Sequence, residues 1–168
     1  MMNVKKLTEL SLLTTIALII FVIELQLPNF IAIPGVKLGL ANIITVYAVY
    51  NYKGKEVMMI VISRIILGSI FSGNIISLLY SLAGGTLCLL AMLFFKHFIL
   101  PKYLWLSSVF GALFHNIGQI VMACLILGNK MIVYLPFLLV SGCIAGVITG
   151  ICAQLIINYL KDRKVLYD

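Results

Sequence analysis

The sequence predicts an all-α membrane protein, a bundle of six transmembrane helices forming one integral membrane domain over residues 1–168. Three observations support this prediction. Hydrophobic residues make up 63% of the chain and charged residues only 10%, whereas soluble domains are typically about 45–50% apolar and about 25% charged. Short polar breaks divide the chain into apolar runs of membrane-spanning length. Lysine and arginine gather at alternate breaks, as expected for a multi-pass topology.

Five polar or proline-containing breaks separate the candidate spans: QLPNF, NYKGKE, FSGN, FKHFILPKY and LGNK. The spans they leave are 7–27, 38–52, 56–72, 75–96, 103–127 and 131–159. Lys5 and Lys6 followed by an apolar run imitate a signal peptide. However, the run over 7–27 is long enough to span, and no A-x-A-like cleavage site follows it, so we expect a retained first helix. The second and third spans are short and depend on a polar turn at Lys53 to Lys55.

The basic residues predict the orientation of the helices. With the N-terminus in the cytoplasm, the inside holds nine lysines and arginines: Lys5, Lys6, Lys53, Lys55, Lys96, Lys102, Lys161, Arg163 and Lys164. The outside holds two, Lys37 and Lys130. This bias predicts a multi-pass plasma membrane protein with both termini in the cytoplasm. The net charge of +7 therefore reflects topology and predicts no nucleic-acid partner.

The segment between the first two spans is predicted to be external. It is apolar but contains Pro28, Pro34 and Gly35, and residues before proline avoid the helical region. Non-helical backbone at membrane depth is tolerated only where it is buried in protein or lines a cavity. We therefore expect a cap or a short re-entrant loop at about residues 28–36.

Polar side chains inside the spans collect in their middle and outer parts, and such residues are functional candidates by default. The candidate ligand-binding residues are Glu24, Lys37, Asn42, Arg64, Asn74, Ser77, Tyr80, His115, Asn116 and Gln119. Ser81 shares a helix face with Asn74 and Ser77. The inner parts are almost purely apolar apart from Gln154. This asymmetry predicts a polar cavity that is open to the outside above an apolar plug.

Each candidate has a simpler interpretation beside the functional one. Lys37 either snorkels to the outer interface or lies at the mouth of the cavity. Arg64 follows Glu56 by eight residues, about 12 Å along a helix, which is too deep for snorkelling. It should pair either with Glu24 or with a bound anion. Because Lys37, Arg64 and His115 face the single acidic Glu24, we expect an anionic or acceptor-rich ligand.

A stripe of small residues marks the last span. Gly142, Gly146 and Gly150 recur every four residues in SGCIAGVITGICAQ. Such a stripe permits close contact between helices. It predicts either packing within the bundle or an interface with another membrane subunit.

Neither metal binding nor catalysis is expected. The four cysteines lie in apolar runs without CxxC pairs, and only two histidines could join them, which favours structural burial over a metal site or disulfides. Mg²⁺ sites use carboxylates together with substrate phosphates, and this chain has no aspartate-rich motif. The only aspartates, Asp162 and Asp168, are in the C-terminal tail. We expect no cofactor, and no enzymatic activity of this chain alone.

Five segments in order, PGVKLGLANI, RIILGSIF, YSLAGG, HNIGQ and YLPFLLVSG, resemble the small membrane family labelled Gx transporter, or heptaprenyl diphosphate synthase component I. The resemblance extends from about Leu10 to Leu160. In length, span number and outward polar half the chain is also similar to substrate-binding S-components of energy-coupling-factor transporters. That likeness implies an outward-facing ligand site capped by the loop between the first two helices. It also implies a shared transmembrane subunit and two ATPases as partners.

Together these observations predict a substrate-binding membrane subunit for uptake of a small vitamin-like, flavin-like or isoprenoid-like molecule. The alternative is a non-catalytic membrane subunit of an isoprenoid, quinone or redox complex. S-components commonly dock through small residues on the first helix. Here that helix offers only Ser11 and Thr15, four residues apart.

Overall fold

The computed structural model describes residues 3–26 and 39–165, and over these residues the chain is helical, with no strand. The helices are α1 (Val4–Gln26), α2 (Asn42–Asn51), α3 (Gly54–Ser72), α4 (Ile75–Phe95), α5 (Leu104–Leu127) and α6 (Leu135–Val165). Two short 3-10 helices, η1 (Pro101–Tyr103) and η2 (Asn129–Tyr134), lead into α5 and α6. The all-α prediction is confirmed. The predicted cap at 28–36 and Lys37 lie outside the described residues.

Four helical segments of the described chain are long and apolar enough to cross a membrane: Val4–Gln26, Ile75–Phe95, Pro101–Leu127 and Asn129–Lys161. By contrast, α2 has 10 residues, about 15 Å of helix, which is half of a hydrocarbon core about 30 Å thick. The predicted span over 38–52 is thus shorter than expected, because a turn at Gly39 to Ala41 delays the helix until Asn42. Four spans are supported by length and composition, and the six-span arrangement stays a prediction.

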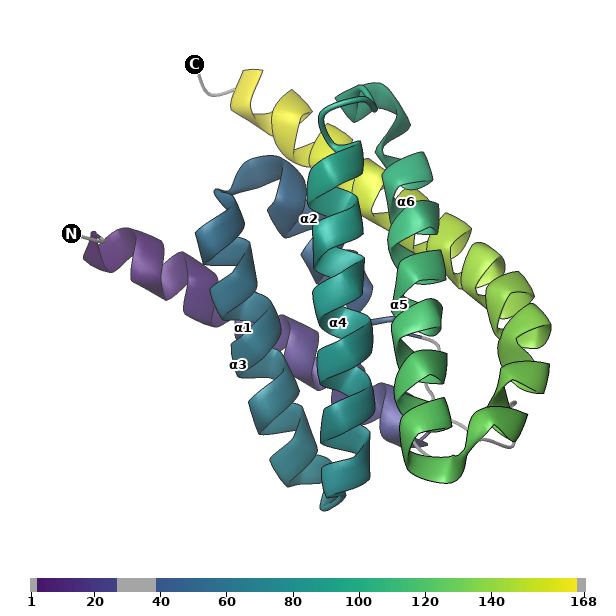
Figure 1. Cartoon of the computed structure of the whole chain (residues 1–168). Helices are drawn as coiled ribbons and strands as arrows, with labels where there is room; N and C mark the ends of the chain where they lie inside the picture. Colours follow the sequence, from purple (N-terminus) through teal and green to yellow (C-terminus); the bar gives the residue numbers. More distant parts are fainter. Residues whose placement is uncertain (1–2, 27–38, 166–168) are drawn as a thin grey trace.

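The helices form a bundle in which α5 packs between α4 and α6 (Figure 1). The N-terminal α1 runs obliquely behind this layer and packs mainly against α3. The short α2 lies inside the bundle, where it contacts α6, α3 and α1. Elements far apart in the sequence therefore meet around α2.

Glycine allows α4 and α5 to approach backbone to backbone. A Cβ placed on Gly118 of α5 would lie 2.5 Å from the Ala83 carbonyl oxygen, and one on Gly84 of α4 would lie 2.9 Å from the His115 carbonyl oxygen. Real Cβ atoms do not approach so closely. The two helices can therefore touch at this level only because both positions are glycine.

The small-residue stripe of α6 packs against α5 of the same chain. A Cβ on Gly146 would lie 2.7 Å from Val109 Cα, and one on Gly150 would lie 2.6 Å from Trp105 Cα. A Cβ on Gly142 would meet the amide of Asn116. The contacts of all three glycines thus correspond to the first alternative, close packing within the bundle.

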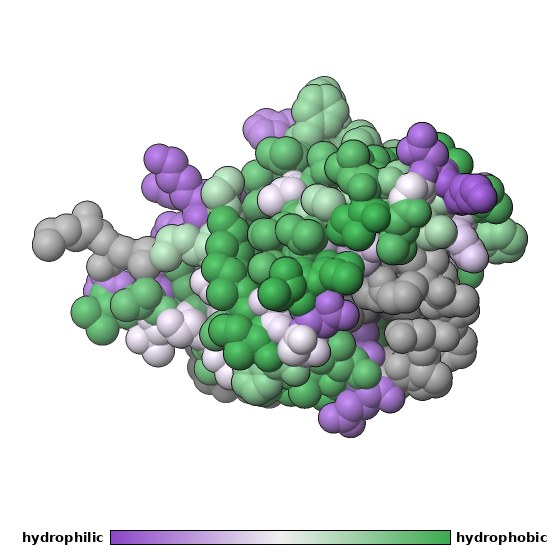
Figure 2. All heavy atoms as spheres, turned by 60° about the horizontal axis from the view of Figure 1, so that its bottom comes forward, coloured by the Kyte–Doolittle hydropathy of each residue, from purple (hydrophilic) through white to green (hydrophobic). Residues whose placement is uncertain are grey.

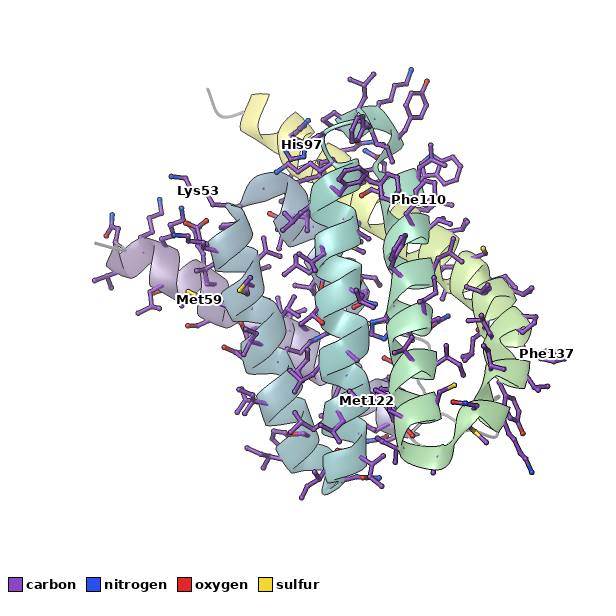
Figure 3. All side chains as sticks on the ribbon, in the orientation of Figure 1. Lys53, Met59, His97, Phe110, Met122 and Phe137 are labelled. Carbon is purple, nitrogen blue, oxygen red and sulfur yellow. The ribbon has the colours of Figure 1, made fainter. Side chains whose placement is uncertain are left out.

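An apolar core fills the part of the bundle toward the turn between α2 and α3. It includes Val49, Val57, Ile60, Cys88 and Met92, all almost fully buried. Lys53 and His97 lie at this same end of the molecule (Figure 3). Lys96 Nζ also donates a hydrogen bond to the Val49 carbonyl oxygen, which ties the end of α4 to α2.

Large apolar side chains cover the outside of the bundle. Those on α6 recur every three or four residues and include Phe137, Val140, Ile144 and Leu155. Figure 2 brings forward the end of the bundle opposite to Lys53 and His97. There, too, most of the described surface is apolar, with scattered hydrophilic groups. An apolar surface of this extent on a water-soluble monomer would be unusual, and it fits helices that face lipid.

Candidate functional site

A small polar cavity lies where five helices meet inside the bundle. Its described lining is Phe21, Glu24, Gly39, Ala41, Asn42, Arg64, Ile65, Ser81, His115 and Gln119. These residues come from α1, the turn before α2, α2 itself, α3, α4 and α5. The cavity is about 20 Å³, which is room for about one water molecule.

Arg64 is the basic residue among the described residues that line this cavity. It is buried, and its Nη1 donates a hydrogen bond to Asn42 Oδ1 at 3.4 Å. A guanidinium carries five N–H donors and no acceptor. In the described part of the chain no carboxylate lies within 4.0 Å of it. Glu24 lines the same cavity and acts on Arg64 through its charge, but the two do not form a contact ion pair.

Glu24 is instead bound to the turn that precedes α2. The backbone N–H of Gly39 donates a hydrogen bond to Glu24 Oε1 at 2.6 Å. Gly39 has a φ of +79°, in the left-handed region that favours glycine. A Cβ at this position would also lie 2.8 Å from Asn42 Nδ2. Glycine at position 39 therefore lets the turn approach both α1 and the Asn42 side chain.

Two further polar atoms in the cavity lack hydrogen-bond partners in the described part of the chain. His115 and Gln119 are one turn apart on α5, and both are buried. Neither His115 Nδ1 nor Gln119 Oε1 has a partner among the described residues. Leaving a buried polar atom unpaired costs about 1–3 kcal/mol. Together with the N–H groups of Arg64, these atoms could form hydrogen bonds with a molecule bound in the cavity.

The other candidates that the structure describes do not line this cavity. Asn74 caps α4, because its Oδ1 accepts hydrogen bonds from the N–H groups of Ile76 and Ser77. Ser77 is buried but does not line the cavity. Tyr80 packs in a separate apolar cluster with Ile120, Ala123 and Leu138, and its hydroxyl has no partner among the described residues.

Asn116 connects two helices through a hydrogen bond and is not among the residues that line the cavity. Its Nδ2 donates a hydrogen bond to the Leu138 carbonyl oxygen at 2.5 Å, which joins α5 to α6. Lys37 lies outside the described residues, so its place at the cavity mouth stays a prediction.

The lining also contains residues that were not among the candidates. Phe21 precedes Glu24 by three residues and therefore lies on the same helix face. Ser81 follows Ser77 by four residues, and this helical spacing is the feature of the sequence that indicates its place in the lining. Gly39, Ala41 and Ile65 carry no polar side chain, so a search for polar residues misses them.

A comparison with protein families shows the family to which this chain belongs. A family model described as heptaprenyl diphosphate synthase component I matches residues 13–156. The chain belongs to this family. The match includes every described residue of the cavity and confirms the resemblance drawn from the sequence motifs. No curated protein and no solved structure matched the chain.

In this member of the family, the groups that line the cavity are suited to binding rather than to metal chemistry. In the described residues, no group of three or more histidine, cysteine, aspartate or glutamate side chains could hold a metal ion. The cavity supplies a buried positive charge, a histidine nitrogen and amide groups. These groups can hold and orient a polar molecule.

Proposed function

We propose that this protein is a substrate-binding membrane subunit that holds a small anionic or acceptor-rich molecule against Arg64. The observation that carries this proposal is the Arg64 guanidinium, which is buried and, within residues 3–26 and 39–165, makes one hydrogen bond, of 3.4 Å, from its five donors. Removing an ionised group from water costs several kcal/mol unless partners compensate it. A ligand anion would supply those partners.

The unpartnered atoms around Arg64 support a specific binding mode. Hydrogen bonds to a charged group contribute about 1.5–3 kcal/mol each. An anionic or carbonyl group of the ligand would accept from Arg64. A donor on the same molecule would satisfy Gln119 Oε1, and His115 Nδ1 would bind either type of group according to its tautomer.

The size of the cavity requires part of the lining to move. A space of about 20 Å³ admits little more than a water molecule, so only the head of a ligand could fit without rearrangement. The turn at Gly39 is the candidate moving part, because it lines the cavity and its N–H is bound to α1 through Glu24. Breaking this contact would widen the site.

We extend the proposal to uptake of a small vitamin-like, flavin-like or isoprenoid-like molecule. In this arrangement six spans place both termini in the cytoplasm of the cell, and a transmembrane subunit with ATPases supplies the energy. Support comes from the four apolar helices of spanning length and from the likeness to S-components.

The family description favours a second candidate function. A component I implies a partner subunit, and this chain would then be the non-catalytic membrane subunit beside an enzyme that makes prenyl diphosphates. The cavity would hold a substrate, product or regulator of that enzyme. Both candidates require a membrane subunit with a polar site, and they differ in the partner.

Affinity purification of the tagged full-length chain from its own host separates the two candidates. Recovery of an ATPase pair supports uptake, and recovery of a prenyl diphosphate synthase supports the second candidate. A small molecule extracted from the purified protein is then titrated against the native chain and Arg64→Met. We expect at least tenfold weaker binding by Arg64→Met, because one charge-assisted hydrogen bond corresponds to about 1.4 kcal/mol or more. Equal affinities would contradict the proposed site.

A further inference from the structure

A second polar site lies at the end of the bundle where α1 begins and α2 ends. This open groove is lined by Asn3, Lys5, Lys6, Glu9, Tyr47, Asn51 and Tyr52. Its volume is about 500 Å³, within the range of ~300–1,000 Å³ that small-molecule sites occupy. It shares no lining residue with the Arg64 cavity.

The positive side of the groove is formed by two lysines of the first turn of α1. Lys6 Nζ pairs with Glu56 Oε1 at 2.6 Å, and Glu56 also accepts a hydrogen bond from the Lys53 backbone N–H at 3.0 Å. Lys5 is exposed and has no carboxylate within 4.0 Å in the described part of the chain. Lys5 therefore remains available for an anionic group.

The other side of the groove combines a carboxylate with two phenols. Glu9 is exposed, and its carboxylate accepts a long hydrogen bond from the Tyr52 hydroxyl at 3.3 Å. Burial, followed by the negative charge of Glu9, raises the pKa of Tyr52 to about 12, so this hydroxyl keeps its proton. Tyr47 lies in the same lining and interacts with the charge of Glu9. A carboxylate beside aromatic rings suits a small ammonium group.

The groove lies at the boundary between polar and apolar surface. Val4, Leu7 and Leu12 expose large apolar side chains on the same first turns of α1. Lysine and tyrosine are typical of the interface between the hydrocarbon core and water. In the membrane arrangement proposed above, a groove at this boundary would lie next to lipid headgroups.

We propose that this groove binds the headgroup of a zwitterionic phospholipid that carries a primary ammonium. The phosphate lies against Lys5, and the ammonium lies between Glu9 and the ring of Tyr47. A purely anionic headgroup would satisfy Lys5 but would be repelled by Glu9. The mixed charge of the groove therefore favours phosphatidylethanolamine over phosphatidylglycerol.

Native mass spectrometry of the full-length chain, released from micelles containing phosphatidylethanolamine or phosphatidylglycerol, tests this inference. We expect the native chain to retain phosphatidylethanolamine preferentially. Glu9→Gln should reduce that preference about tenfold, and Lys5→Gln should weaken retention of both lipids. Lys130→Ala, in η2 and outside this groove, should change neither. Both groove substitutions are at exposed side chains, so we expect the variants to fold.

Three outcomes would overturn the inference. The first is equal retention of the two lipids by the native chain. The second is a lipid preference that is unchanged in Glu9→Gln. The third is displacement of the lipid by inorganic phosphate at the same concentration, which would assign the groove to a free anion.

Discussion

Arg64 of α3 donates a hydrogen bond to Asn42, the first residue of α2, at 3.4 Å. This contact joins a deeply buried charge to the start of the shortest α-helix. Glu24 binds the Gly39 N–H three residues earlier in the chain. The turn before α2 is therefore held between a cation and a carboxylate that do not form a contact pair with each other.

Replacing Arg64 by methionine should affect ligand binding far more than stability. Among the residues that the structure describes, the guanidinium has one long hydrogen bond, and replacing a poorly compensated buried charge by an apolar residue is often neutral or stabilising. We expect the free energy of unfolding in detergent, without ligand, to change by less than about 2 kcal/mol. A loss of about 3–5 kcal/mol would instead indicate a structural ion pair.

Replacing Glu24 by alanine should loosen the turn before α2. The substitution removes the acceptor of the Gly39 N–H, a charge-assisted bond of about 1.5–3 kcal/mol. The measurement is maleimide labelling of Ala41→Cys, a buried position of the cavity, in a background without the native cysteines. We expect labelling at least tenfold faster in the presence of Glu24→Ala.

The matched control is Ala153→Cys, which is fully buried on α6 and does not line the cavity. Its labelling rate should be the same with and without Glu24→Ala. If Ala41→Cys also keeps its rate, the Glu24 contact does not hold the turn closed.

The sequence predicts which ionisable residues lie in this site better than it predicts which neighbouring polar residues are excluded from it. Glu24, Arg64 and His115 stand out because ionisable side chains inside apolar spans are rare, and each lines the cavity. Asn116 has the same polar character, but one residue along a helix rotates the side chain by about 100°. It therefore points toward α6, and the distinction from His115 depends on how α5 is rotated within the bundle.

The helix lengths were less predictable for a related reason. Hydropathy counts apolar residues and does not detect a turn within an apolar run. Gly39, with its positive φ, lies in such a turn, so α2 begins only at Asn42 although the sequence before it is apolar. Asn74 illustrates a second difficulty: its polar side chain at a helix start caps α4, a role that hydropathy cannot distinguish from ligand binding.

Gly84→Ala should destabilise the protein, whereas Gly54→Ala should not. The new methyl group at position 84 would lie 2.9 Å from the His115 carbonyl oxygen, in a contact between two backbones that cannot yield easily. We expect a loss of about 1–3 kcal/mol. At Gly54 the nearest atoms are 3.5 Å away, and a helical glycine replaced by alanine typically gains about 0.4–1 kcal/mol. Denaturation in detergent measures both, and equal effects would contradict the close α4–α5 contact.

Single cysteines at positions 53 and 130 should be labelled from opposite sides of the membrane. Lys53 precedes α3 and lies at the same end as His97 (Figure 3), whereas Lys130 is in η2 between α5 and α6. With the basic residues inside, an impermeant maleimide added to whole cells should react at position 130 and not at position 53. Labelling of position 53 from outside would overturn the proposed orientation.

Lys37→Ala should weaken ligand binding by about one to two orders of magnitude if this lysine lies at the cavity mouth, since a charge-assisted hydrogen bond contributes about 1.5–3 kcal/mol. Lys130→Ala should have little effect. The measurement is the thermal shift that the ligand induces in each variant. Equal shifts in both variants and the native chain would identify Lys37 as an interface anchor.

The most direct test of the binding site is native mass spectrometry of the full-length chain purified from its own host. We expect the native chain and Lys130→Ala to carry a small molecule of the same mass, and Arg64→Met to carry none. A native chain without any such molecule, or an equally occupied Arg64→Met variant, would contradict the claim that Arg64 marks a ligand site.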